Sequence, residues 1–360
     1  MASIGTSMRD KVFGAYLGAA VGDALGGPAQ AMHAERIRSS FGGVNEMLAY
    51  RKPPGFLDIG SPGYAMHDAP GSVTGETLIR SQIARFVIDH PHSRSVPEFL
   101  HFLTHHGDLK IWPPQMAEVI ERALRERLPP EVASRAIAPG GGLGWWTAIG
   151  VANAGRPDRA AEEVIRLSAL WKRPLEQDLL AAVQAGVAHA LTPKATPDSV
   201  VEAGRSVVRP LARRLIDRAV ALARLAPRGD IAALCDRLYK AALVTAAPDG
   251  ADGELPTPAP PPPSDAPTAS PLFAEQAPLA FAALIFGDGR SRLTLTAAAS
   301  LGRDAKAIGS AVGSLIGGLV GRSRLPREWV GTVIGANHDD VDLVQQANDL
   351  ANLLEPEVQY

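Results

Sequence analysis

The sequence predicts an all-α protein, and two observations support that prediction. Apolar residues recur every three or four positions through most of the 360 residues, and the sequence shows no sustained alternation of the kind typical of β-strands. Alanine is abundant while aromatic residues make up only 5% of the chain, a composition that favours closely packed helices over a β-sandwich. We therefore expect helices to build the core.

Start signals and helix breakers define the expected elements. Pro113 and Pro114 open one helix, Asp230 is suited to cap another, and the glycine-rich turn after Asp23 ends the first. In chain order, helices are expected over residues 10–25, 77–90, 114–124, 158–171, 177–191, 198–225, 230–245 and 340–354.

One late segment has a row of glycines at helical spacing. Gly309, Gly313, Gly317 and Gly321 recur every four residues. Each glycine costs a helix about 1 kcal/mol relative to alanine. Such a row persists where another backbone must approach closely, so we expect this helix to lie at the centre of the bundle.

Residues 246–271 differ in kind from the rest, since they hold nine of the 30 prolines, including the run 260–263. Too little apolar surface is present there to offset the entropy of ordering, and we expect a disordered linker. It is either a plain surface insertion or a ligand for a proline-reading partner of unknown identity. We expect one domain over residues 8–335, interrupted by this segment, with residues 336–360 carrying a C-terminal helix packed on it.

Charge and apolar patterning exclude several classes of protein. Lys and Arg total 36 against 38 for Asp and Glu, so no basic excess points to nucleic acid. The longest apolar stretch, 307–320, is shorter than the roughly 20 residues that a membrane span requires, and the N-terminus lacks the features of a signal peptide. The single Cys235 cannot form an internal disulfide and suits a reducing compartment. We expect a cytoplasmic protein that binds neither nucleic acid nor membrane.

Three polar segments stand at helix ends. They are residues 22–30 (GDALGGPAQ), residues 73–77 (VTGET) and residues 302–306 (GRDAK). Oxygen-rich clusters at helix starts are either caps, with Thr74 or Asp304 accepting backbone N–H bonds, or groups that converge on a hard cation or a polar ligand. The residues alone leave both interpretations open.

The order of these segments resembles the ADP-ribosylglycohydrolase family. The resemblance rests on GAYLGAAVGDALGGP, the Thr-x-x-Thr helix start at Thr74 and Thr77, GRDA running into a glycine-rich helix, and the late LPREW, and it covers residues 10–335 outside the insertion. It implies a compact orthogonal helical bundle with an ADP-ribose-type cleft where the carboxylate segments meet. In that family two magnesium ions there bind ribose hydroxyls and a water while a glycosidic bond is hydrolysed.

The sequence departs from the family at the expected metal ligands. Gly75 replaces the first aspartate of Thr-Asp-Asp-Thr and Glu76 replaces the second. Asp304 keeps one late aspartate, but Lys306 stands where the family has another. Other departures are Ala307 for the final threonine of the late segment, Gln30 for a common glutamate, residues 140–146 (GGGLGWW) for Gly-Asn-Gly-x-x-Met-Arg, and Trp171-Lys172 for Thr-His.

These departures predict a site without metal or other cofactor. Mg²⁺ requires oxygen ligands, and two close ions require several anions, but only Glu76 and Asp304 remain. An ammonium opposes metal binding by Coulomb repulsion, so we expect Lys306 to occupy the space of a metal and pair with both carboxylates. The alternative is a Lys306 side chain turned to solvent.

Two classes of function remain. The first is a metal-independent enzyme acting on a ribosyl, nucleoside-like or related small molecule, with Glu76 or Asp304 as acid/base and Lys306 stabilising developing charge. The second is a pseudoenzyme that binds an ADP-ribose-like ligand or a protein partner without turnover. Trp145 and Trp146 either belong to the core or stack on a planar ligand. The expected substrate-binding residues are Asp23, Gln30, Thr74, Thr77, Gly141, Gly142, Trp145 and Trp146.

Overall fold

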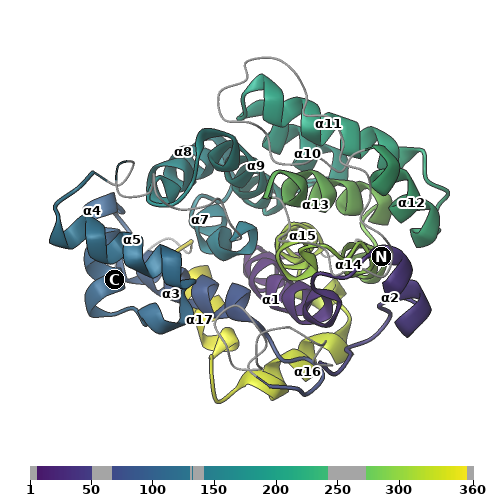
Figure 1. Ribbon diagram of the computed structural model, residues 1–360, viewed down its shortest axis with the longest axis horizontal. Coiled ribbons are helices and arrows are strands. Elements are labelled where there is room, and N and C mark those ends of the chain that lie inside the picture. The colour runs from purple at the N-terminus through teal and green to yellow at the C-terminus, as the bar shows by residue number, and fades with distance from the viewer. Residues whose placement is uncertain (1–5, 51–66, 130–131, 133–141, 242–272, 355–360) are drawn as a thin grey trace.

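The computed structural model describes residues 6–50, 67–129, 132, 142–241 and 273–354, and it confirms the all-α prediction (Figure 1). No strand is present among these residues. The α-helices are α1 (Met8–Gly26), α2 (Ala34–Phe41), α3 (Gly75–Asp89), α4 (Val96–His105), α5 (Pro114–Arg125), α7 (Thr147–Ala152), α8 (Pro157–Ser168), α9 (Pro174–Ala190), α10 (Pro197–Ser206), α11 (Pro210–Arg224), α12 (Ile231–Ala241), α13 (Phe273–Gly287), α14 (Ser291–Ser300), α15 (Ala305–Val320), α16 (Arg327–Asn337) and α17 (Leu343–Asn352). Short 3₁₀ turns are η1 (Gly27–Ala29), η2 (Leu109–Ile111), η4 (Leu143–Trp146) and η5 (Arg322–Arg324).

Proline and hydroxyl residues begin many of these helices. Five helices have proline at their first position, where a backbone N–H would make no hydrogen bond within the helix, so its absence costs nothing. These residues are Pro114, Pro157, Pro174, Pro197 and Pro210. The single helix expected over 198–225 is wrong, because the chain forms α10 and α11 with a break between them. Proline disfavours the helical conformation of the residue before it, so the second helix starts afresh.

Helices α1 and α15 form the centre of the bundle, and their glycines lie against each other. A Cβ added to Gly22 would lie 1.8 Å from the carbonyl oxygen of Gly309, and one added to Gly18 would lie 2.4 Å from that of Gly313. Only glycine allows this backbone-to-backbone approach. The expected central position of the glycine-rich helix is confirmed, and the close contact fixes the ends of both helices relative to each other.

The other helices surround this pair (Figure 1). Helices α3, α4 and α5 lie on one side with α8, while α10, α11, α12 and α13 lie on the other. The C-terminal helix α17 packs on α1, where the Tyr16 hydroxyl donates to Gln346 Oε1 at 2.6 Å. Cys235 of α12 is buried, and its thiol lies 3.6 Å from the carbonyl oxygen of Ser300 at the end of α14.

Two sequence expectations concern segments rather than single residues. The proline-rich stretch 246–271 lies outside the described residues. The apolar stretch 307–320 lies within α15 and is buried for most of its length. Within the part of the chain that the structure describes, no helix combines the length and the apolar character that crossing a bilayer requires.

Candidate functional site

Asp23, near the C-terminal end of α1, binds the N-terminus of α3. Its carboxylate accepts hydrogen bonds from the backbone N–H and the hydroxyl of both Thr74 and Thr77, at 2.6–3.2 Å. Thr74 in turn caps α3 by accepting from the N–H of Glu76 at 3.1 Å. The structure therefore brings these three expected residues together, with their polar atoms directed at one another. Their role in substrate binding stays a prediction.

The N-terminus of α15 is held beside the end of α1 by a short backbone pairing. The Ala31 N–H donates to the carbonyl oxygen of Arg303 at 2.7 Å, and the Arg303 N–H donates to the carbonyl oxygen of Met32 at 2.9 Å. Arg303 adopts a positive φ of 59° and forms a partly buried ion pair with Glu275 at 2.7 Å. This rigid turn presents Asp304, the next residue, to the interior.

Asp304 is 5% exposed and precedes the first residue of α15. Its carboxylate does not cap the helix but accepts from the side-chain amides of Gln30, at 2.9 Å, and Gln276. Burial raises the pKa of Asp304, while the nearby Lys306 and the Gln30 hydrogen bond act in the opposite direction. Gln30 therefore meets Asp304 as part of one hydrogen-bonded group.

Glu76, in the first turn of α3, is 4% exposed, and its Oε2 atom has no hydrogen-bond partner. A Cβ on Gly144 would lie 3.2 Å from this oxygen, so the turn η4 covers the carboxyl group closely. Burial raises the pKa of Glu76 to about 8. The positive charge of Lys306 lowers this pKa, the negative charges of Asp304 and Asp23 raise it further, and the positive charge of Arg80 lowers it. At neutral pH Glu76 is therefore mostly a neutral acid.

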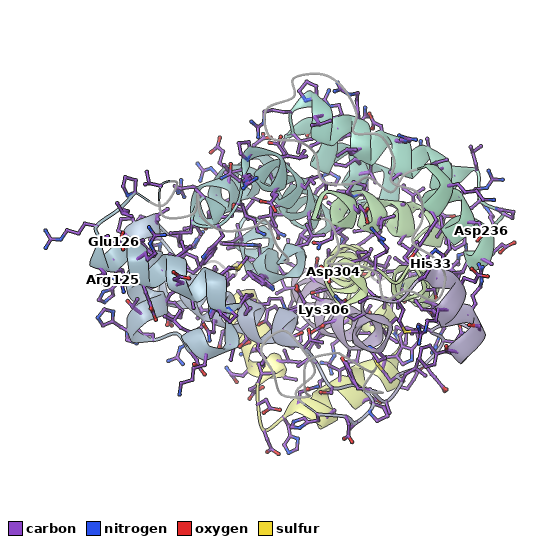
Figure 2. All side chains as sticks on the ribbon, in the orientation of Figure 1. His33, Arg125, Glu126, Asp236, Asp304 and Lys306 are labelled. Carbon is purple, nitrogen blue, oxygen red and sulfur yellow. The ribbon has the colours of Figure 1, made fainter. Side chains whose placement is uncertain are left out.

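Lys306 lies in the first turn of α15 and is partly exposed (Figure 2). A cation at this position opposes the helix dipole, which favours negative charge at an N-terminus. Attraction to the carboxyl groups of Glu76 and Asp304 offsets this unfavourable interaction with the dipole. The same attraction lowers the pKa of both carboxyl groups. The three expected catalytic residues therefore interact with one another.

A second lysine, which the sequence analysis did not select, joins this group. Lys172 lies in the loop before α9 with its side chain 1% exposed, and its Nζ is 3.9 Å from Glu176 Oε1. Burial lowers the pKa of Lys172 to about 8, while Glu176, Glu76 and Asp304 act to raise it. We refer to Glu76, Asp304, Lys306 and Lys172 as the charged cluster.

Arg80 borders the charged cluster and was also missed. It is fully buried on α3, one turn after Glu76, and donates to Ser310 Oγ at 2.9 Å and Thr77 Oγ1 at 3.1 Å. Its guanidinium lies over the Tyr16 ring at 5.2 Å. An arginine four residues after Glu76 in an apolar helix was the available signal, because such spacing places both side chains on one face.

The two tryptophans of η4 belong to an aromatic cluster. Trp145 and Trp146 are 3% and 0% exposed, and Trp145 packs edge-on against Trp112 with ring centroids 5.3 Å apart. Gly142 has a φ of 103°, and a Cβ there would touch the Trp145 ring at 2.6 Å. Both rings thus pack in the core, although neither indole N–H has a partner. Gly141 lies outside the described residues.

Comparisons with known proteins agree with this arrangement of segments. The family model of ADP-ribosylglycohydrolase matches residues 5–358. The chain belongs to the ADP-ribosylglycohydrolase family. A solved structure titled "ADP-ribosylglycohydrolase-related protein complex" superposes with a TM-score of 0.61 at 16% identity, covering 97% of this chain and 99% of the other, which shows a shared fold. No curated protein matches the sequence.

The charged cluster does not fit the two magnesium ions implied by the family. Mg²⁺ takes oxygen ligands in octahedral geometry and needs anionic charge. Among the described residues, no group of three or more His, Cys, Asp or Glu side chains is placed to hold a metal. The Asp304 carboxylate already accepts from two amides, and two lysines bring positive charge to the group. The chemistry available from these residues is proton transfer and charge stabilisation.

Proposed function

We propose that this member of the ADP-ribosylglycohydrolase family hydrolyses a glycosidic bond of a ribosyl or nucleoside-like small molecule without a divalent cation. The observation that carries the proposal is Glu76, a buried carboxyl group with a pKa raised to about 8 and one unpartnered oxygen beside a carboxylate and two lysines. Strongly perturbed ionisable groups gathered at one place are typical of catalytic sites.

Each member of the site has a role in this proposal. Protonated Glu76 donates its proton to the leaving atom of the glycosidic bond, as a general acid whose pKa lies near the working pH. Asp304, held in place by Gln30 and Gln276, faces the positive charge that develops on the ribose ring. Lys306 stabilises negative charge on the leaving group or on a substrate phosphate.

Substrate is proposed to approach from the side of Lys306 and Gln30, because these two residues are partly exposed while Glu76 and Asp304 are buried. No metal-bound water takes part in the reaction. Glu76 protonates the leaving group, and Asp304 orients the attacking water and accepts its proton. That proton returns to Glu76 through solvent after the products leave.

The test is hydrolysis of nucleosides and of small ADP-ribosyl compounds, carrying N-glycosidic or O-glycosidic links, by the purified protein with either EDTA or Mg²⁺. We expect turnover that is insensitive to EDTA, falls as the pH rises through about 8, and decreases at least about 100-fold in Glu76→Gln. Glu98→Gln, at a partly exposed capping residue of α4, is the matched control and should be as active as the parent. Activity that requires Mg²⁺, or an active Glu76→Gln, would contradict the proposal.

A second candidate is binding of an ADP-ribose-like ligand or a protein partner without turnover. It is favoured by the contacts of Asp304 and Asp23, whose carboxylate oxygens all bind groups of the protein itself. Calorimetric titration with ADP-ribose separates the two candidates, since binding of ADP-ribose without hydrolysis of any of the test substrates would select the second.

A further inference from the structure

Helix α4 carries two imidazoles side by side on its exposed face. Phe102 and Leu103 are buried in the core, which fixes the rotation of the helix and leaves His101 and His105 exposed. The two histidines are four residues apart, a spacing that places side chains on the same face of a helix. Their rings stack with centroids 4.1 Å apart. The helix thus holds two nitrogen ligands within reach of one ion.

The hydrogen bonds around His105 decide which of its ring nitrogens is available. Its Nδ1 lies 2.9 Å from the carbonyl oxygen of His101, and a carbonyl oxygen can only accept. The Thr104 hydroxyl is also 2.9 Å from this Nδ1, but its own proton goes to the carbonyls of Leu100 and His101. Nδ1 therefore carries the proton of the neutral ring, and Nε2 keeps the lone pair. Metal-binding histidines are oriented in this way, with the second ring nitrogen donating to a carbonyl or carboxylate oxygen.

The surroundings of the pair suit a bound cation. His105 is the last residue of α4, and the C-terminal end of a helix carries partial negative charge. Both histidines line a groove of about 990 Å³ between α4 and α5, so water molecules have room to complete the coordination of an ion. Arg127 lines the same groove after the end of α5, but its side chain is exposed and solvent screens its charge.

Imidazole nitrogens select the class of ion. Zn²⁺ and Cu²⁺ bind neutral imidazole readily, whereas Mg²⁺ and Ca²⁺ require oxygen ligands. Two ligands on one helix bind an ion more tightly than two separate imidazoles, because binding to the first raises the effective concentration of the second. Among the described residues no group of three or more His, Cys, Asp or Glu side chains is placed to hold a metal, so here the protein supplies two ligands and water the others.

We propose that His101 and His105 form a surface site for a divalent late transition-metal ion of the Zn²⁺ or Cu²⁺ type, bound through His105 Nε2 and one ring nitrogen of His101. The site is separate from the charged cluster, since α4 lies at the edge of the molecule in Figure 1 whereas Asp304 and Lys306 lie near its centre in Figure 2. It is independent of the proposed hydrolysis.

The test is a calorimetric titration of the metal-free full chain with Zn²⁺, at neutral pH in a buffer that does not bind metals. We expect saturable binding that an excess of Mg²⁺ does not displace. His101→Gln and His105→Gln should each weaken this binding at least about 10-fold, because each variant leaves only one imidazole to hold the ion. In the double variant the number of Zn²⁺ ions bound per chain should fall by one.

His92→Gln is the matched control, since it removes an exposed imidazole from the loop between α3 and α4 and leaves the pair intact. Its Zn²⁺ titration should equal that of the parent protein. A ligand that binds only the folded state also stabilises it, so Zn²⁺ should raise the melting temperature of the parent and of His92→Gln, but raise that of the double variant less.

Three results would overturn the proposal. The first is a parent protein that shows no saturable binding of Zn²⁺. The second is a double variant that binds as many Zn²⁺ ions, and as tightly, as the parent. The third is a loss of binding in only one of the two single variants, because a single imidazole would then hold the ion without its neighbour.

Discussion

Replacing Glu76 by glutamine should change the pH dependence of stability in a defined direction. Burial raises the pKa of Glu76 from the 4.5 of an ordinary glutamate to about 8, so the folded protein holds this proton more tightly than the unfolded chain. The contribution of Glu76 to stability is complete below about pH 4.5 and is lost as the pH rises to about 8. Glutamine stays neutral throughout and shows no such loss.

The magnitude follows from the size of the shift. Each unit of pKa difference corresponds to about 1.4 kcal/mol, and most of the interval between the two pKa values lies between pH 5 and pH 8. The free energy of unfolding of Glu76→Gln, taken relative to the parent protein, should therefore rise by about 3 kcal/mol over this range. Titrating groups that do not interact with Glu76 are shared by the two proteins, so their contributions largely cancel in the difference.

Urea denaturation followed by circular dichroism at pH 5, 6, 7 and 8 measures this difference. Glu98→Gln is the control, because hydrogen bonds from Ser95 lower the pKa of Glu98. Glu98 therefore loses its contribution to stability only as the pH falls below the ordinary pKa of a glutamate. The difference in unfolding free energy between Glu98→Gln and the parent should thus be flat from pH 5 to pH 8. A flat or falling difference for Glu76→Gln would refute the assignment of Glu76 as a buried neutral acid.

Three further predictions concern the framework and the site, each measured by denaturation. Gly22→Ala should lower the free energy of unfolding by about 3 kcal/mol or more, because the new methyl group would overlap the carbonyl of Gly309. Gly331→Ala is the control: its methyl group meets open space on α16, so it should raise the free energy of unfolding by no more than about 1 kcal/mol. Asp23→Ala should cost about 3–5 kcal/mol, since four buried donors lose a charged acceptor; a loss below 1 kcal/mol would contradict the contacts. Lys306→Ala should cost about 1–2 kcal/mol at pH 8 and less at pH 5, where the carboxyl groups are protonated; a cost that does not depend on pH would mean that the lysine faces solvent.

The sequence was sufficient for the fold class because helical periodicity is a local property. The glycine row of α15 also predicted a close backbone contact. The partner helix was not predicted. Gly14, Gly18, Gly22 and Gly26 have the same spacing on α1, but spacing alone does not say which two helices meet. The break before Pro210 was missed because the apolar pattern continues on both sides of it.

The site was predicted in part. Glu76, Asp304 and Lys306 could be grouped because the order of three segments resembles a family, not because their own spacing requires contact. The resemblance marked Lys172 only as a departure from the Thr-His of the family, and nothing placed it in the site, since a lysine between two helices looks like a surface residue until the fold buries it. Asp23 likewise reads as a ligand-binding carboxylate, and only the fold shows that its oxygens bind the start of α3.

The central claim, that Lys306 takes the place of the metal ions of the family, can be tested by restoring the ligands. Gly75→Asp combined with Lys306→Asp adds two carboxylates and removes one cation at the positions where this sequence departs from the family. Gly75→Asn combined with Lys306→Asn is the matched neutral control, since it changes size and polarity to a similar extent without adding negative charge.

The most direct measurement is a calorimetric titration of the parent protein and both double variants with millimolar Mg²⁺. Mg²⁺ binding depends on anionic oxygen ligands. We predict no saturable heat for the parent protein and the asparagine variant, and saturable binding for the Gly75→Asp/Lys306→Asp variant. Saturable binding of Mg²⁺ by the parent protein, lost in Asp304→Asn, would contradict the claim.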